Sequence, residues 1–179
     1  MKILVLTGSP HKNGTTALLA DEFCSGALQS SHEIIRIDAG ELKVNPCIGC
    51  NHCLKNEGKC VYEYDDMIEI IPHLFTVDAV VLVSPLYYFG MTAQLKRVID
   101  RFYSVNSLLR KDTKKLYLIS AGADTDEWAM DAIKSHYKCL CKYLNWQEGG
   151  ELLAYGLSTR QDAENSEYKS MARELGKEI

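Results

Sequence analysis

What this sequence lacks excludes several classes of protein. No apolar run approaches the length of a membrane-spanning helix, which is about 20 residues. The 20 lysines and arginines do not outnumber the 24 acidic residues, so the net charge of −4 gives no electrostatic basis for binding nucleic acid. The apolar stretch at the amino terminus is only a few residues long, too short for a signal peptide. We therefore expect a cytoplasmic protein with neither a membrane nor a nucleic acid as its partner.

Motifs that identify several other functions are also absent. Gly14 is followed by Thr15, not by the lysine that a Walker A loop needs. The fingerprint G-x-G-x-x-G of dinucleotide-binding domains is missing, because the turn contains only Gly8 and Gly14. The first apolar strand ends without the acidic residues of a receiver domain. No cysteine has an arginine six positions later, as a low-molecular-weight phosphatase requires.

The composition is that of one globular domain. The 179 residues are 46% apolar and 25% charged, enough for a single domain with a full core that spans residues 1–179. A cysteine-rich loop lies at about residues 45–62, and residues 164–179 have the pattern of a polar terminal helix or a mobile tail. In a reducing compartment the seven cysteines are expected to be thiols or metal ligands, not disulfides.

Apolar strands alternate with amphipathic helical segments along the chain. Strands are expected at residues 3–6, 33–37, 79–83 and 116–120, with a fifth within residues 150–155. This alternation predicts βαβ units and a parallel sheet covered by helices on both faces. Ligands of such sheets bind outside the carboxyl ends of the strands. The loops after the first, third and fourth strands therefore form the candidate site.

The loop after the first strand has the composition of an anion-binding site. It leads directly into a helical pattern, so the free N–H groups and the positive dipole end of that helix face the loop. Ser9, Thr15 and Thr16 add hydroxyl donors and Asn13 adds an amide. Gly14 leaves room for a ligand to approach the backbone. The loop is suited to a phosphate, and a capped turn without a ligand is the alternative.

The loops after the third and fourth strands favour a flat aromatic ligand. Tyr87, Tyr88 and Phe89 stand in a row between Pro85 and Gly90, where an apolar surface is a liability unless something covers it. Apolar walls with accessible backbone amides suit a heteroaromatic ring. Packing against neighbouring loops or in a dimer interface is the alternative. The fourth strand ends in small residues that let a ring lie close to the backbone.

Three motifs, taken in order, resemble those of the NADPH-dependent FMN reductase group of flavodoxin-like proteins. They are Gly8-Ser9-Pro10-x-x-Asn13-Gly14-x-Thr16, Ser84-Pro85-x-Tyr87-Tyr88 and Lys96-x-x-Ile99-Asp100-Arg101. The resemblance extends from residue 1 to about residue 122. It implies a flavodoxin-like α/β fold, with a doubly wound five-stranded parallel sheet in the order 2-1-3-4-5, and a bound FMN.

The same resemblance assigns the residues that would bind FMN. By position, the phosphate would be held by Ser9, Lys12, Asn13, Gly14, Thr15 and Thr16. The isoalloxazine ring would lie against Pro85, Leu86, Tyr87, Tyr88, Phe89 and Gly90, with Ala121 and Gly122 on its other side. Asp100 and Arg101 are mostly structural in that family. No side chain is identified as catalytic, because the flavin carries the chemistry.

Four cysteines form a compact motif between the second strand and the next helix. Cys47, Cys50, Cys53 and Cys60 have the spacing Cys-x-x-Cys-x-x-Cys-x6-Cys, which wraps thiolates round one centre and suits a [4Fe–4S] cluster or a tetrahedral zinc. This spacing is similar to that of the iron–sulfur flavoproteins, which share the fold and the FMN loops. A cluster, a zinc ion and free or redox-active thiols are all compatible with it. The other three cysteines, Cys24, Cys139 and Cys141, lie on helical patterns and are expected in the core.

Two functions are consistent with these motifs. The first is an FMN-dependent NAD(P)H:acceptor oxidoreductase, which would pass hydride to FMN and then reduce a quinone, a nitro- or azo-aromatic, a free flavin or a redox protein by ping-pong turnover. The second is an iron–sulfur flavoprotein that transfers electrons, with a [4Fe–4S] cluster relaying them to FMN. The resemblance also implies a homodimer or a tetramer, because a neighbouring subunit often completes an open flavin edge.

Overall fold

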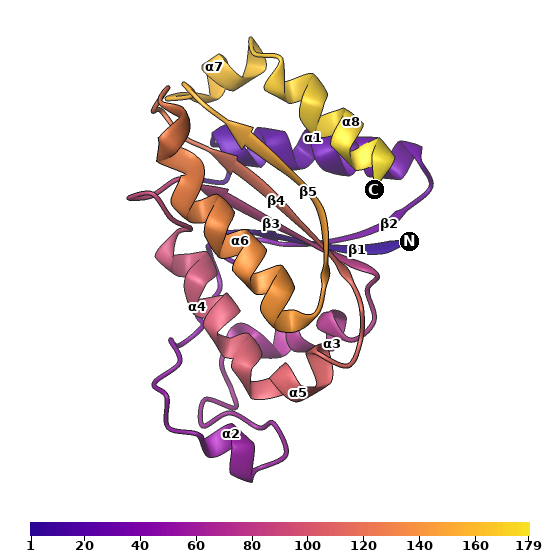
Figure 1. Cartoon of the computed structure of the whole chain (residues 1–179), viewed down its shortest axis with the longest axis vertical. Coiled ribbons are helices and arrows are strands. Elements are labelled where there is room, and N and C mark those ends of the chain that lie inside the picture. Colours follow the sequence, from indigo (N-terminus) through magenta and orange to yellow (C-terminus); the bar gives the residue numbers. More distant parts are fainter.

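The computed structural model describes the whole chain, residues 1–179, and its centre is a five-stranded parallel sheet (Figure 1). The strands are β1 (Lys2–Thr7), β2 (Glu33–Ile37), β3 (Ala79–Pro85), β4 (Lys115–Ala121) and β5 (Gln147–Ala154). Neighbouring strands pair in parallel in the order β2-β1-β3-β4-β5. The predicted α/β architecture and strand order are confirmed.

Helices cover both faces of this sheet. The α-helices are α1 (Thr15–Gln29), α2 (His52–Lys55), α3 (Ile71–Leu74), α4 (Ala93–Arg101), α5 (Asn106–Leu109), α6 (Asp131–Leu144), α7 (Arg160–Glu164) and α8 (Tyr168–Glu178), and short 3-10 helices span Asp66–Glu69, Phe102–Val105 and Glu127–Met130. Figure 1 shows α1, α7 and α8 on one face, α3 to α6 on the other, and α2 in a loop that extends beyond α4 and α5. None of these helices combines the length and apolar character that crossing a bilayer requires.

The central strands bury side chains on both faces of the sheet. Leu4 and Leu6 of β1 belong to the core beneath α4 and α6, whereas Ile3 and Val5 belong to the core beneath α1 and α8. Because both faces of a central parallel strand are buried, such a strand is a continuous apolar run rather than an alternating one. These runs are the reason that the central strands could be predicted from the sequence.

The fifth strand begins earlier than the sequence indicates. It starts at Gln147, three residues before the expected segment, and lies at the edge of the sheet, where one face is less buried. Its glycines accommodate a neighbour, because a Cβ at Gly149 would lie 2.3 Å from the ring of Tyr117 on β4. The first half of this strand consists of polar residues and glycines, so a search for apolar runs does not detect it.

The C-terminal segment forms a helix that packs closely against α1. A Cβ at Gly26 of α1 would lie 2.0 Å from the carbonyl oxygen of Arg173, and one at Gly176 of α8 would lie 2.1 Å from that of Phe23. Arg173 also donates to the Glu22 carboxylate, with 2.8 Å between Nε and Oε2. Of the two alternatives for residues 164–179, the structure therefore has the helix.

Replacing Gly26 by Ala should destabilise the fold, because the added methyl group forces α1 and α8 apart. We expect Gly26→Ala to lower the free energy of unfolding by about 1–3 kcal/mol, the range for overpacked sites. Urea denaturation followed by circular dichroism measures the change. Gly90→Ala is the control, because a Cβ at Gly90 meets no atom within 4 Å. Equal midpoints for Gly26→Ala and the wild type would contradict the close helix contact.

Candidate functional site

A cleft of about 420 Å³ lies at the carboxyl ends of β1, β3 and β4. Its volume is within the range of small-molecule sites, and its position is the one expected for a parallel sheet. It is lined by Ser9, His11, Asn13, Gly14, Thr15, Thr16, Pro85, Leu86, Tyr87, Ala121, Gly122, Ala123, Leu157, Ser158, Thr159 and Arg160. Polar groups gather on the β1 side of the cleft, and the apolar Leu86 and Tyr87 lie on the β3 side.

The loop from β1 to α1 is fixed by three neighbouring segments. The Gly8 N–H donates to the carbonyl oxygen of Val83 at 2.7 Å, and the Thr92 hydroxyl donates to the carbonyl oxygen of Gly8 at 2.7 Å. From the side of β2, Gly40 approaches so closely that a Cβ there would lie 2.2 Å from the carbonyl oxygen of Ser9. The loop therefore has a defined backbone without a ligand.

The start of α1 offers unpaired donors to the cleft. The N-cap residue is Gly14, which supplies no side-chain cap, and the first turn of the helix contains no acidic residue. The first N–H groups of an α-helix have no partner within the helix, and the helix dipole makes this end positive. The Ser9 hydroxyl oxygen lies nearby and accepts the His11 N–H at 3.1 Å. An anion with several acceptor oxygens matches this arrangement.

An aromatic hairpin follows β3 and borders the cleft through Tyr87. Tyr87 and Gly90 exchange two backbone hydrogen bonds of 3.0 and 3.1 Å, so Tyr88 and Phe89 occupy the tip. Both tip residues are left-handed, with φ angles of 47° and 67°, which is unfavourable for aromatic side chains. The Phe89 ring lies 5.2 Å from the ring of Trp128, and Tyr88 is 97% exposed.

Ten of the fourteen residues assigned to FMN by sequence border this cleft. They are Ser9, Asn13, Gly14, Thr15, Thr16, Pro85, Leu86, Tyr87, Ala121 and Gly122. The other four, Lys12, Tyr88, Phe89 and Gly90, do not line it. The Lys12 ammonium lies 2.9 Å from the Glu41 carboxylate, and that hydrogen bond raises the pKa of Lys12. The roles of all fourteen residues in binding FMN stay predictions.

Six lining residues were missed by sequence reasoning. They are His11, Ala123, Leu157, Ser158, Thr159 and Arg160. The last three residues include a helix start that the sequence could have revealed: Thr159 accepts the Asp162 N–H at 3.2 Å, and Asp162 accepts the Thr159 N–H at 2.7 Å. This capping box predicts where α7 begins. It does not predict that α7 begins beside the loop after β1, which lies about 150 residues earlier in the chain.

The four clustered cysteines meet at a second place. Cys47, Cys50, Cys53 and Cys60 border one hollow of about 20 Å³, together with residues that include Tyr62, Asp100, Arg101, Tyr103 and Ser104. No three His, Cys, Asp or Glu side chains lie close enough together to hold a metal ion. The thiols therefore share one hollow without surrounding a metal position.

The backbone of the cysteine loop suits an anionic ligand. Four of the ten residues with positive φ in the chain lie there, namely Gly49, Asn51, Glu57 and Gly58. The N–H groups of residues 47–50 have no backbone acceptor. Left-handed residues within such loops turn consecutive N–H groups to one side, as in many phosphate and iron–sulfur sites. The loop fits an iron–sulfur cluster in its donors, although the hollow must widen to admit one.

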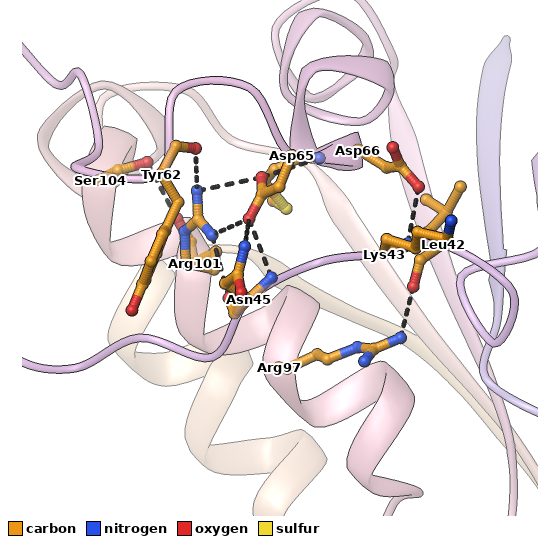
Figure 2. A network of polar contacts seen from close by, with 10 residues as sticks. Leu42, Lys43, Asn45, Tyr62, Asp65, Asp66, Arg97, Arg101 and Ser104 are labelled. Carbon is orange, nitrogen blue, oxygen red and sulfur yellow. Dashed lines mark hydrogen bonds and ion pairs between the residues drawn. The ribbon is translucent and has the colours of Figure 1, made fainter.

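A buried ion pair closes the base of this loop, and Figure 2 shows its contacts. Arg101, which is 2% exposed, lies 2.5 Å from Asp65 between Nη1 and Oδ2. Arg101 also donates to the carbonyl oxygens of Asn45 at 3.0 Å and Tyr62 at 3.3 Å, on either side of the cysteines. Burial alone would raise the pKa of Asp65, but hydrogen bonds from Arg101 and from the Asn45 N–H hold it below its usual value. We call this group of four residues the loop neck.

A wider groove of about 580 Å³ adjoins the cysteine hollow. It shares Cys47, Asp100 and Tyr103 with the hollow, and α6 forms its other side through residues that include His136 and Tyr143. Burial lowers the pKa of His136, and the charge of nearby Lys96 lowers it further. The groove therefore presents a mainly apolar surface beside the thiols.

The three remaining cysteines do not all lie in the core. Cys141 is buried and Cys24 is half-buried, and burial raises the pKa of each thiol to about 11. Cys139 is exposed, so its expected place in the core was wrong. The buried face of α6 consists of Ile133, Tyr137, Cys141 and Leu144. Cys139 lies two residues from Tyr137 and from Cys141, which places it on the opposite side of the helix.

Known proteins resemble this chain over most of its length. Residues 1–140 match the family described as NADPH-dependent FMN reductase. An iron–sulfur flavoprotein of Methanocaldococcus jannaschii is 41% identical over 101 residues, which are 56% of this chain and 51% of that protein. An iron–sulfur flavoprotein of Archaeoglobus fulgidus is 39% identical over 101 residues, covering 56% of this chain and 45% of that protein. The chain spans about half the length of the curated relatives it matches.

A solved structure shares the fold at lower identity. NAD(P)H:quinone oxidoreductase from Methanothermobacter marburgensis superposes with a TM-score of 0.76 at 16% identity, covering 99% of this chain and 94% of that chain. At this identity the likeness establishes the flavodoxin-like fold alone.

The strained hairpin leads to a prediction about stability. Replacing Tyr88 by Asn should raise the free energy of unfolding by about 1 kcal/mol, because Asn tolerates the left-handed region and the exposed ring loses little packing. The control is Tyr64→Asn, because Tyr64 is 94% exposed but has no positive φ. Urea denaturation of both variants measures the difference. If Tyr88→Asn is no more stable than Tyr64→Asn, the hairpin tip stores no strain.

Proposed function

This chain belongs to the NADPH-dependent FMN reductase family, and we propose that it is an electron-transfer flavoprotein with FMN in the cleft and an iron–sulfur cluster in the cysteine loop. The observation that carries this proposal is the meeting of four cysteines at one hollow, on the same chain as a cleft at the carboxyl ends of the strands and the start of α1. The relatives named iron–sulfur flavoproteins support the same function.

The phosphate of FMN is proposed to lie at the amino terminus of α1. There the N–H groups of Thr15 and Thr16, together with the hydroxyl group of Ser9, can donate to its oxygens. The neighbouring cations are already paired, since Lys12 contacts Glu41 and Arg160 contacts Glu164. Dipoles and short hydrogen bonds therefore supply most of the attraction.

The flavin ring is proposed to occupy the side of the cleft formed by β3 and β4. Leu86 and Tyr87 would contact the ring, and Gly122 leaves the backbone accessible, because a Cβ there would lie 3.1 Å from Leu86. The N–H of Ala123 borders the cleft and has no acceptor within the chain. Such a free donor can stabilise negative charge on a reduced flavin.

Bound FMN would accept electrons in pairs and release them singly, and a [4Fe–4S] cluster would carry one electron at a time. The chain's part is to supply the ligands and their setting. Cys47, Cys50, Cys53 and Cys60 offer four thiolates, and the unpaired N–H groups of residues 47–50 can donate to sulfur. The loop neck keeps the two ends of the loop together.

We further propose that two copies of the chain are needed for electron transfer between the sites. The cleft and the cysteine hollow have no lining residue in common, and Figure 1 places the α2 loop beyond α4 and α5, away from α1. The mainly apolar groove beside the thiols offers a surface for a second copy. A homodimer could then bring the hollow of one copy to the cleft of the other.

A second candidate function is NAD(P)H-dependent reduction of a small acceptor without a cluster. The family description favours it, and Tyr87 at the border of the cleft offers a ring on which a nicotinamide or quinone could stack. In that case the cysteines would act as free thiols.

The phosphate position is tested by removing its hydroxyl donors. The double variant Ser9→Ala/Thr16→Ala should bind FMN at least tenfold more weakly, because each hydrogen bond to a charged group contributes about 1.5–3 kcal/mol. Fluorescence titration of the apoprotein with FMN measures the affinity. The control is Ser25→Ala/Thr113→Ala, whose residues border neither the cleft nor the hollow. Unchanged affinity in the first variant would place the phosphate elsewhere.

The cluster is tested by replacing one ligand. After anaerobic reconstitution with ferrous iron and sulfide, Cys50→Ser should lose the iron that the wild type binds, and both should keep FMN. Iron analysis and the visible spectrum measure these quantities. The control is Cys139→Ser, because Cys139 is exposed and lies outside the loop. Iron-free wild-type protein would refute the proposed cluster.

The same samples separate the two functions. If the cluster relays electrons, Cys50→Ser should reduce a one-electron acceptor protein more slowly than Cys139→Ser does, with NAD(P)H as the donor. Equal rates would favour the second candidate. Sedimentation of the same samples tests the proposed assembly, because a monomer that still transfers electrons between the sites would contradict it.

A further inference from the structure

The guanidinium of Arg101 has one donor that the chain does not use. Arginine carries five N–H groups, four of them on Nη1 and Nη2. In Arg101 these two nitrogens make four contacts, two with the Asp65 carboxylate and one each with the carbonyl oxygens of Asn45 and Tyr62. The remaining nitrogen, Nε, is buried and has no partner (Figure 2). Buried donors of native proteins are rarely left unpaired, so we expect this N–H to donate to an acceptor outside the chain.

Arg101 borders two hollows, the cysteine hollow and a mostly apolar groove of about 440 Å³, and only the first gathers four possible sulfur acceptors. Arg101 borders the cysteine hollow, and it is the only lysine or arginine that does so. The other charged residue at the hollow is Asp100, which is paired with Lys96 at 2.5 Å. A site of four thiolates is strongly anionic, so a buried cation beside it would offset the negative charge of the sulfurs and could donate a hydrogen bond to one of them.

We infer that Arg101 is a positioning residue of the cysteine site: its Nε–H donates to a sulfur of the bound cluster while its other four N–H groups close the loop neck. This inference rests on the proposed function. It gives one side chain two separable effects. The neck contacts keep Asn45 and Tyr62 together, so that the thiols face one hollow. The Nε hydrogen bond stabilises the reduced, more negative cluster and therefore raises its reduction potential.

A nearby arginine provides a matched control. Arg97 lies one turn earlier on α4, and its Nε is also buried without a partner. Its Nη2 donates to the carbonyl oxygen of Leu42, so it too ties α4 to the segment before the cysteines. Arg97 does not border the hollow. A change in the cluster that comes from a contact in the hollow should therefore appear in Arg101 variants and not in Arg97 variants. A change that comes from losing any buried arginine of α4 should appear in both.

The test compares Arg101→Lys with Arg97→Lys in the full chain, loaded with FMN and reconstituted anaerobically with ferrous iron and sulfide. Lysine keeps the charge but has no group equivalent to Nε. We expect Arg101→Lys to bind iron and to lower the reduction potential of the cluster. At a fixed applied potential, the ratio of reduced to oxidised cluster should fall about tenfold. For a one-electron couple this is about 59 mV. Arg97→Lys should keep the wild-type potential.

A second variant separates the hydrogen bond from the neck. Asp65→Asn weakens the neck but leaves the Arg101 guanidinium in the chain. Trypsin should then cleave the metal-free loop at Lys55 or Lys59 faster than in the wild type, while the potential of the reconstituted cluster stays closer to wild type than that of Arg101→Lys. If Arg101→Lys fails to fold, the proteolysis of Asp65→Asn still tests the neck against the wild type, and equal cleavage rates would contradict the role of Arg101 there.

The outcomes are distinguishable. A wild-type protein that binds no iron and gives no thiolate-to-metal absorption with Co2+ refutes the proposed cluster, and this inference with it. A wild-type protein that binds iron, with equal potentials in the wild type, Arg101→Lys and Arg97→Lys, overturns the inference alone. Equal shifts in the two arginine variants also overturn it, because they would reflect packing of α4. If trypsin cleaves Asp65→Asn no faster than the wild type, the loop neck does not hold the two ends of the cysteine loop together.

Discussion

The hydrogen bond from Thr92 to Gly8 joins α4 to the loop after β1, and both candidate sites depend on this connection. Thr92 is fully buried, caps α4 by accepting the Leu95 N–H at 3.2 Å, and donates to the loop beneath the cleft at 2.7 Å. From there α4 runs for nine residues, about 14 Å at 1.5 Å per residue, to Arg101 at the loop neck. One helix therefore contacts the loop after β1 at one end and the cysteine loop at the other.

The parts that could be predicted from the sequence are those encoded locally. Central strands buried on both faces are apolar runs, and a strand followed by glycine, hydroxyl residues and a helix start predicts an anion-binding loop whatever surrounds it. The four cysteines are close in sequence, so their spacing alone predicts a common hollow. The outer strand β5 was located only in part, because its first half is polar and relies on Gly149 lying against Tyr117.

The parts that could not be predicted depend on contacts between distant segments. Arg160 reaches the cleft only because β5 pairs with β4 and returns the chain to the same edge of the sheet. Trp128 meets the aromatic hairpin because β4 pairs with β3, so the segments that follow these two strands lie at the same edge of the sheet. The resemblance implied only a structural role for Arg101, and its pairing with Asp65 joins residues 36 positions apart. Hydrophobic periodicity carries no information about such pairs, since both members are polar.

The two candidate sites differ in how they would stabilise negative charge, and this difference follows from their burial. Lys12 near the cleft and Arg160 at its border are paired with acids, so the helix dipole and hydroxyl donors would carry the attraction and would favour several acceptor oxygens on one terminal group. A phosphate monoester offers such a group. At the cysteine loop a buried guanidinium borders the same hollow as the four thiols, and its charge is less screened because water is excluded. The first arrangement selects a ligand by shape, whereas the second sets the electrostatic environment of whatever the thiols hold, which is the property that a redox centre needs.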